Sequence, residues 1–199
     1  MDLLVIRHAE PERVVLDSGA ADPPLHDRGR VQAARLADWL AAEPLDAIVV
    51  SPLRRARETA VDLARATGLD PVLDDGVAEY DRSSSWYIPV EELKATGDER
   101  WKAMIAGDYI EGDEDLTTFV ARVTEAFRGI VAAHAGHRVA VICHGGVINQ
   151  YICDVLGLAP SMFFEPRYTS ISRVAASRSG VRTLVSLNET AHLRGLPGF

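Results

Sequence analysis

The sequence is constrained most strongly by short apolar runs that alternate with longer segments of helical periodicity. Three of these runs have four to six residues, the length of a strand rather than a helix: Leu3–Ile6, Leu45–Val50 and Val139–Cys143. Largely apolar runs of this kind are typical of strands buried on both faces of a parallel sheet. Their alternation with helical segments indicates an α/β fold in which helices cover the sheet.

The helical segments are identified by the spacing of their apolar residues and by their ends. In the first segment, Ala33, Leu36 and Leu40 recur at helical spacing, and Asp27 is the expected N-cap. The other expected helices are Leu53–Thr67, closed by Gly68, then Leu116–His134, and Val147–Leu156, closed by Gly157. Weaker strand patterns are Pro71–Leu73 and a terminal hairpin of Ser172–Ala176 and Val181–Leu187.

We therefore expect a single domain over residues 1–199. Its predicted architecture is a three-layer sandwich, with a mostly parallel central sheet and helices on both faces. The segment from about residue 80 to 113 has poor periodicity and contains several aromatic residues: Tyr80, Trp86, Tyr87, Trp101 and Tyr109. This pattern suits a small inserted lid over a site, and it equally suits an ordinary helical excursion with aromatic packing.

Charge and composition argue against several classes of protein. The net charge is −8 and the pI is near 5.2, which argues against a nucleic-acid binder because such proteins need a basic surface. No apolar stretch reaches the length of a membrane span and the start carries no signal-peptide pattern, so we expect no membrane partner and a cytoplasmic location. Cys143 and Cys153 are expected to be reduced core thiols.

Polar and cationic residues follow the ends of the predicted strands. Arg7-His8 follows the first strand, Ser51 to Arg55 the second, and His144-Gly145-Gly146 a later one. Because the carboxyl ends of parallel strands lie at the same edge of a sheet, these groups can converge on a single pocket. Arginine offers planar, permanently charged donors to phosphate oxygens, and glycines at a helix start let backbone N–H groups approach an anion. The pattern predicts a site for a phosphoryl group.

Several segments in order along the chain carry a resemblance to a known family. They are Arg7-His8, Pro24-Leu25 with Gly29, Gln32 and Ala33, Ser51-Pro52-Leu53-Arg54-Arg55-Ala56 with Thr59 and Ala60, Glu79, His144-Gly145-Gly146, and Asn188 to Leu193. This succession resembles the histidine phosphatase superfamily, in the branch that includes cofactor-dependent phosphoglycerate mutases and many small phosphatases. The resemblance extends over nearly the whole chain.

The resemblance implies a phosphatase that hydrolyses a phosphomonoester through a phosphohistidine intermediate. By this likeness His8 is the nucleophile, while Arg7, Arg55 and His144 bind the phosphoryl oxygens and stabilise their charge. Gly145 is expected to contribute to substrate binding, and Glu79 to act as the general acid and then the general base. The competing acids are Glu10, Asp74, Asp75 and Asp81. The partner is a small phosphorylated substrate, and we expect no metal and no cofactor.

The sequence departs from the family pattern near the first histidine. Ala9, Pro11 and Val14 stand where the family often has glycine, threonine and asparagine. A pseudophosphatase that binds a phosphorylated ligand without turnover is therefore the alternative function. Phosphoglycerate mutase activity is disfavoured, because Glu79 is followed by Tyr80-Asp81-Arg82-Ser83 rather than by the mutase motif Glu-Arg-x-Tyr-Gly.

Three questions stay open from the sequence alone. The substrate can be a sugar phosphate, a phosphoglycerate, a nucleotide or a phosphohistidine protein. The consequence of Pro11 and Val14 for activity is undecided. The oligomeric state is also undecided, with a homodimer as one option. A zinc-dependent hydrolase is disfavoured because no His-Glu-x-x-His or Pro-Cys-x-x-Cys motif is present.

Overall fold

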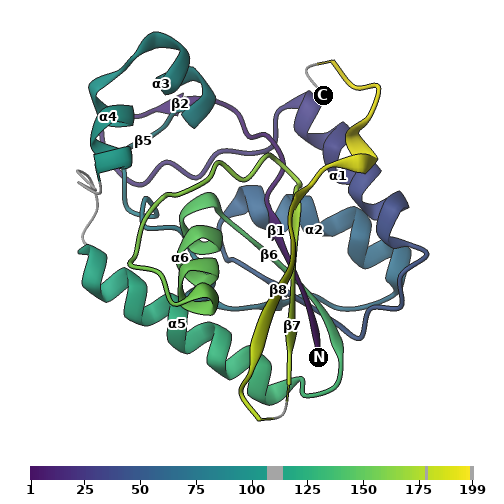
Figure 1. Cartoon of the computed structure of the whole chain (residues 1–199). Helices are drawn as coiled ribbons and strands as arrows, with labels where there is room; N and C mark the ends of the chain where they lie inside the picture. The colour runs from purple at the N-terminus through teal and green to yellow at the C-terminus, as the bar shows by residue number, and fades with distance from the viewer. Residues whose placement is uncertain (107–113, 178, 198–199) are drawn as a thin grey trace.

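The computed structural model describes residues 1–106, 114–177 and 179–197, and a six-stranded sheet lies at its centre (Figure 1). The strand order is β4-β3-β6-β1-β7-β8. Strands β4, β3, β6 and β1 are parallel, whereas β7 is antiparallel to β1 and β8 to β7. The strands are β1 (Asp2–Arg7), β2 (Val14–Val15), β3 (Ala47–Val50), β4 (Val72–Leu73), β5 (Trp86–Tyr87), β6 (Arg138–Cys143), β7 (Ile171–Ala176) and β8 (Arg182–Glu189).

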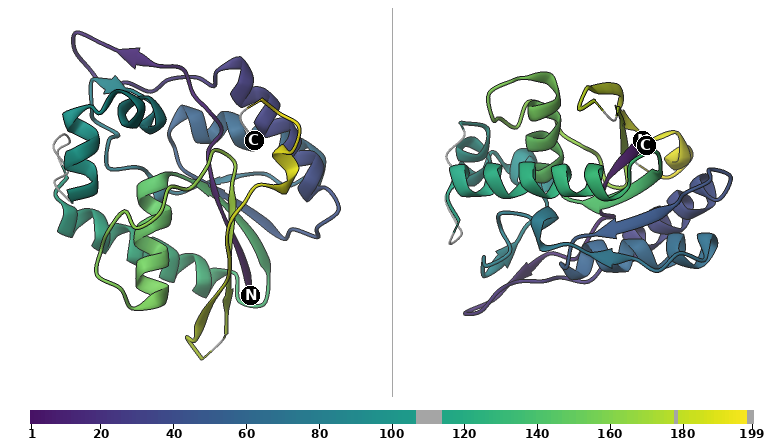
Figure 2. Two further views of the ribbon diagram at one scale, coloured as in Figure 1. Left: turned by 45° about the horizontal axis from the view of Figure 1, so that its top comes forward. Right: turned by 90° about the horizontal axis from the view of Figure 1, so that it is seen from below.

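Helices cover both faces of this sheet (Figure 2). They are α1 (Asp27–Leu40), α2 (Arg54–Thr67), α3 (Val90–Thr96), α4 (Glu99–Ala106), α5 (Leu116–Ala133) and α6 (Gly145–Leu156), with short 3₁₀ helices η1 (Asp75–Val77) and η2 (Ala191–Leu193). Helices α1 and α2 pack on one face, and α5 and α6 on the other. The predicted three-layer α/β sandwich with a mostly parallel sheet is confirmed.

The two-residue period of a strand explains how one apolar run serves both layers. Leu3 and Val5 of β1 point into the cluster that contains Phe127 of α5. Leu4 and Ile6 alternate with them and pack among side chains of α1 and α2. Because both faces are covered, the run needs no polar residue until its end, where Arg7 and His8 follow.

One predicted helix start is wrong. The N-cap of α1 is His26, whose side chain accepts a hydrogen bond from the backbone N–H of Arg28, and Asp27 is already the first helical residue. The imidazole ring nitrogen of His26 supplies the acceptor that a capping carboxylate would have supplied. The negative charge of Asp27 in the first turn still interacts favourably with the helix dipole.

The segment after residue 80 is fixed by a small second sheet that the sequence pattern does not reveal. Strand β2 pairs with β5, so that Val14 lies opposite Tyr87 and Val15 opposite Trp86. Helices α3 and α4 follow, and this segment stands beside the carboxyl end of β1 (Figure 1). Residues 107–113, which complete the predicted lid and include Tyr109, lie outside the described residues.

Two further expectations concern the cysteines and membrane-spanning helices. Cys143 and Cys153 are buried free thiols, as predicted. Within residues 1–106, 114–177 and 179–197, no helix combines the length and apolar character that a membrane crossing requires.

Candidate active site

The carboxyl ends of the parallel strands open onto a cavity that contains the residues predicted for the site. Arg7, His8, Arg55, Glu79 and Gly145 all line this cavity, whose volume is about 110 Å³. His144 is not among the described residues that line the cavity, but its ring lies 5.0 Å from the ring of His8. All five side chains that the sequence singles out are buried: Arg7, His8, Arg55, Glu79 and His144. Residues separated by more than 130 positions in the sequence therefore meet at one edge of the sheet.

Backbone hydrogen bonds fix the position of His8 at the end of β1. Its N–H donates to the carbonyl oxygen of Cys143 on β6 over 2.9 Å, so the residue continues the pairing of the two strands. On the other side, the N–H of Thr169 donates to the carbonyl oxygen of Arg7 over 3.0 Å. The backbone that carries the imidazole is therefore hydrogen-bonded on one side to β6 and on the other to the segment at Thr169.

Motif residues from α1 and α2 hold the loop that follows His8. The N–H of Ala9 donates to Thr59 Oγ1 over 2.9 Å, and the N–H of Glu10 donates to Gln32 Oε1 over 2.9 Å. A Cβ atom at Gly29 would lie 2.0 Å from the carbonyl oxygen of Glu10, so only glycine lets α1 approach this loop. The glycine, glutamine and threonine of the sequence motifs therefore hold the loop that follows His8, and none of the three is among the described residues that line the cavity.

The hydrogen bond made by His8 defines which ring nitrogen is free. Its Nδ1 lies 2.8 Å from the carbonyl oxygen of Ala9. Because a carbonyl oxygen only accepts, Nδ1 carries the proton and Nε2 keeps its lone pair. Burial, and then the charges of Arg55 and Arg7, hold the pKa of His8 well below its usual value. The ring is neutral near pH 7 and able to act as a nucleophile.

His144 is held by Ser51, the residue that follows β3. Nε2 of His144 lies 2.7 Å from Ser51 Oγ, and that oxygen also accepts from the N–H of Leu53 over 3.3 Å. Burial, and then the charge of Arg55, keep the pKa of His144 well below its usual value. Its Nδ1 is buried and makes no hydrogen bond to the described residues. A buried nitrogen without a partner is costly, so this atom is suited to a bound ligand.

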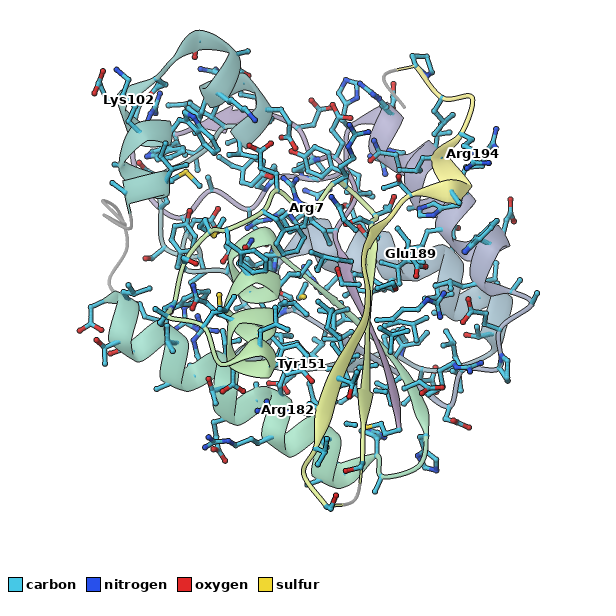
Figure 3. All side chains as sticks on the ribbon, in the orientation of Figure 1. Arg7, Lys102, Tyr151, Arg182, Glu189 and Arg194 are labelled. Atoms are coloured by element: carbon cyan, nitrogen blue, oxygen red, sulfur yellow. The ribbon has the colours of Figure 1, made fainter. Side chains whose placement is uncertain are left out.

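Arg7 reaches the cavity from the end of β1 and bonds to two other segments. Nη1 donates to Glu91 Oε1 of α3 over 2.9 Å and to the carbonyl oxygen of Pro166 over 2.7 Å. The guanidinium lies 3.8 Å from the centre of the Tyr168 ring. Burial opposes the charge, but Glu91 and the tyrosine rings outweigh it and raise the pKa of Arg7. Figure 3 shows Arg7 between the sheet and the segment that carries α3 and α4.

Arg55 occupies the other side of the cavity, in the first turn of α2. Its Nη2 donates to Asp81 Oδ1 over 2.8 Å, and the guanidinium lies 4.7 Å from the centre of the Tyr87 ring. Its Nε is buried and has no hydrogen-bond partner within the described part of the chain. Both arginines are thus ion-paired with carboxylates, and both retain the planar donor groups that suit phosphate oxygens.

Glu79 is an acidic residue that lines the same cavity as His8. Its Oε2 accepts a hydrogen bond from the N–H of Gly146 over 2.8 Å, at the start of α6. Burial, and then the charge of Asp81, raise the pKa of Glu79 to about 7. Of the competing acids, only Asp81 also lines the cavity in the described chain, and Asp81 is paired with Arg55.

A single arginine on α5 fixes the turn that presents Glu79. Nη1 of Arg122 donates to the carbonyl oxygens of Asp75, Gly76 and Ala78, over 3.1, 3.0 and 2.9 Å. Gly76 lies so close to α5 that an added Cβ would come within 2.5 Å of the Ala126 side chain. Contacts with α5 therefore hold the turn that carries Glu79 in place.

The residues that depart from the family pattern lie outside the cavity lining. Pro11 is buried and pairs with Leu25 in an isolated bridge, and Val14 pairs with Tyr87 in the small second sheet. Neither is among the described residues that line the cavity. Val14 nevertheless bears on the site, because the strand that it pairs with carries the tyrosine stacked on Arg55.

Two parts of the site were not found from the sequence. Glu91 was missed because no motif marks it, and it meets Arg7 only through the placement of α3. Tyr87 and Tyr168 flank the His8 ring, with centres 6.3 and 5.7 Å away. Tyr87 belongs to the aromatic segment predicted as a lid over a site, whereas no sequence motif marks Tyr168. Ser51 and Thr59, by contrast, lie within the motif segments and could have been assigned from them.

Comparisons with known proteins find relatives named as a phosphatase and as a phosphoglycerate mutase-like protein. The chain is 30% identical over 197 residues to phosphoserine phosphatase 1 of Hydrogenobacter thermophilus, covering 96% of this chain and 93% of that protein. It is 32% identical over 159 residues to phosphoglycerate mutase-like protein 4 of Arabidopsis thaliana, covering 75% and 68% of the two chains.

A solved structure and a family model extend the comparison. The crystal structure of phosphoserine phosphatase from Entamoeba histolytica in complex with 3-phosphoglyceric acid superposes with a TM-score of 0.76 at 26% identity, covering 96% of this chain and 98% of that one. Residues 3–190 match the model of the histidine phosphatase superfamily, branch 1. The resemblance seen in the motifs is confirmed, and the chain belongs to the histidine phosphatase superfamily.

Proposed function

We propose that this protein is a phosphatase that hydrolyses a small phosphomonoester through a phosphohistidine on His8. The observation that carries the proposal is the Nδ1 bond of His8 to Ala9, because it leaves a neutral imidazole with its Nε2 lone pair in a cavity flanked by two arginines. The relatives named as phosphoserine phosphatases support the reaction class.

In the first step, Nε2 of His8 attacks phosphorus and the bond from phosphorus to the ester oxygen breaks. The leaving oxygen takes the proton of Glu79, whose pKa of about 7 leaves it partly protonated at neutral pH. The products are the free alcohol, a phosphohistidine and a Glu79 carboxylate.

In the second step, water attacks the phosphorus of phosphohistidine. Glu79 takes a proton from this water, and the bond to Nε2 breaks to release inorganic phosphate. His8 and the protonated Glu79 are then regenerated, so the cycle balances without a redox partner. Arg7, Arg55, Nδ1 of His144 and the backbone at Gly145 are assigned to the non-reacting phosphoryl oxygens in both steps.

The segment from about residue 80 to 113 is proposed as a lid within the single domain 1–199. Its described part lines the cavity with Trp86, Tyr87 and Trp101. The chemistry assigned to the side chains needs no metal, so we expect turnover to survive treatment with a chelator.

One observation favours the alternative of a binding protein without turnover. Both phosphate-binding arginines are already paired with carboxylates, Arg7 with Glu91 over 2.9 Å and Arg55 with Asp81 over 2.8 Å. A phosphate group has to displace or share these partners. We favour the phosphatase over this alternative because a neutral nucleophile and a partly protonated acid line the same cavity. We favour it over a mutase because the mutase motif does not follow Glu79.

The test is hydrolysis of p-nitrophenyl phosphate by the parent protein and by His8→Ala, each with and without a chelator. We expect the parent to be active in both conditions and the variant to lose at least about 10³-fold, because removal of a nucleophile leaves only binding and electrostatic effects. Equal turnover in parent and variant would refute His8 as the nucleophile. Phosphate binding without turnover in the parent would establish the pseudophosphatase.

A further inference from the structure

The cavity has a second region beyond the catalytic groups. We call Arg7, His8, Arg55, Glu79 and His144 the floor. The remaining apolar lining residues lie within two separate segments, 80–104 and 162–166, and are here called the wall. A phosphoryl group seated on the floor would direct its organic substituent toward this wall.

Helices α3 and α4 present apolar side chains to the cavity at helical spacing. Val90 and Leu93 line it from α3, and Trp101 and Met104 from α4. Helix α4 has no fully buried residue, and Trp101 and Met104 are each half-buried. Large apolar side chains that are left partly open at a cavity gain stability when an apolar ligand group covers them.

The charged residues that line the same region are held in ion pairs. The Arg100 guanidinium makes two hydrogen bonds to the Asp98 carboxylate, of 2.9 and 2.7 Å, and lies 4.7 Å from the Trp86 ring. Glu165 is paired with Nζ of Lys94 over 2.5 Å. The ammonium and carboxylate groups of an amino-acid phosphate would have to break these pairs to gain partners there, at a cost in desolvation.

We infer that the substrate or ligand is a phosphomonoester whose organic part is apolar, an alkyl or aryl group rather than an amino acid or a sugar. The inference rests on the proposed function for the seating of the phosphate, and it assigns selectivity to the wall. Trp101 and Met104 are the principal specificity-determining residues, because they are the large apolar side chains that α4 presents to the cavity.

Two homologous series separate binding from turnover. Ethyl, butyl and hexyl phosphates have leaving groups of closely similar basicity, so their kcat/KM values differ through contacts with the organic part. Ethyl, butyl and hexyl phosphonates are not hydrolysed and report binding alone, measured by calorimetry. O-phosphoserine is the charged comparison substrate.

We expect kcat/KM, and the affinity for the phosphonates, to rise about threefold to fourfold for each methylene group that is fully buried. Trp101→Ala should lower the hexyl-to-ethyl affinity ratio about tenfold, and Met104→Ser serves as the second variant if the first does not fold. Trp39→Ala is the matched control, because Trp39 is an exposed residue of α1 outside the cavity lining. It should leave the ratio unchanged.

The outcomes distinguish the two proposals. A flat phosphonate series, or a preference for phosphoserine over hexyl phosphate, would overturn the apolar ligand class whether or not the protein turns over. A steep phosphonate series without hydrolysis of any phosphate would support the ligand class and overturn the phosphatase. An equal fall of the hexyl-to-ethyl ratio in Trp39→Ala would refute the role of the wall.

Discussion

The floor and the wall of the cavity meet where Arg7 bonds to Glu91, yet they are held by different kinds of interaction. In the floor, Arg7, His8 and His144 stand at the ends of parallel strands, and the backbone around His8 is bonded to neighbouring strands, to α1 and to α2. Part of the wall stands on α3 and α4, which have seven and eight residues, and α3 fully buries only Leu93.

This difference places the chemistry and the selectivity in separate parts of the fold. Phosphoryl transfer depends on positions accurate to a fraction of an ångström, which strands in the core can provide. An apolar contact tolerates larger shifts in position. A segment with few buried residues can therefore form the wall, and its sequence can change without disturbing the floor. Changes in the floor should therefore lower the rate for every substrate, and changes in the wall should alter the dependence on the organic group.

The largest effect after His8→Ala is expected from Glu79→Gln. Loss of a general acid costs about 10²–10⁴-fold in rate for an alkyl phosphate, whose leaving group needs a proton. The loss should be much smaller for p-nitrophenyl phosphate, because its leaving group is stable as an anion. An equal loss for both substrates would contradict the role of Glu79 as an acid.

The same variant tests the pH dependence. Glu79 must be protonated to donate, and its pKa is raised to about 7, so kcat/KM for alkyl phosphates should fall as the pH rises above about 7. The pKa of His8 lies well below its usual value, so His8 stays unprotonated and reactive at and below neutral pH. Glu79→Gln should lack the alkaline fall, and its persistence would mean that another group titrates.

A smaller loss is expected from Gly146→Ala, which moves Glu79 without removing it. A Cβ atom at Gly146 would lie 2.4 Å from Glu79 Oε1, whereas one at Gly145 would meet nothing within 4 Å. We expect kcat to fall about tenfold to a hundredfold in Gly146→Ala, within the contribution of a general acid. The hexyl-to-ethyl ratio should be unchanged, and a change in it would break the division between floor and wall.

The smallest effect is expected from Glu91→Gln, at the junction of the two regions. Removal of the charge frees Arg7 from a competitor, so inorganic phosphate should inhibit at a severalfold lower concentration. Glu92→Gln is the matched control, because Glu92 is next in the same helix and pairs with the exposed Arg13 instead. Weaker phosphate binding in Glu91→Gln would show that the carboxylate orients Arg7 rather than competes for it.

The same division explains what the sequence could predict. The strands that carry Arg7, His8 and His144 are apolar runs bounded by polar residues, and their shared edge follows from parallel pairing. The spacing of apolar residues predicted α1 correctly, but the predicted N-cap was wrong. The acceptor is the ring nitrogen of His26, and imidazole is an uncommon capping group.

The wall was predictable only as an irregular aromatic segment. Its strand β5 pairs with β2, and each of these strands has two residues, too few to show a period. They pair across more than 70 positions in the chain. The pair of Arg7 and Glu91 joins residues 84 positions apart and leaves no local pattern. Such contacts are fixed by tertiary packing, so only the structure reveals which residues of the segment face the site.

The most direct test of the account is the position of the phosphoryl group in a trapped intermediate. After brief reaction with substrate and alkaline quenching, cleavage at arginine releases His8–Arg13, a peptide with one histidine, separate from the peptide that contains His144. We predict an acid-labile phosphate on the peptide of His8. Its presence on the peptide of His144, or its absence from both during active turnover, would contradict the proposal that His8 is the nucleophile.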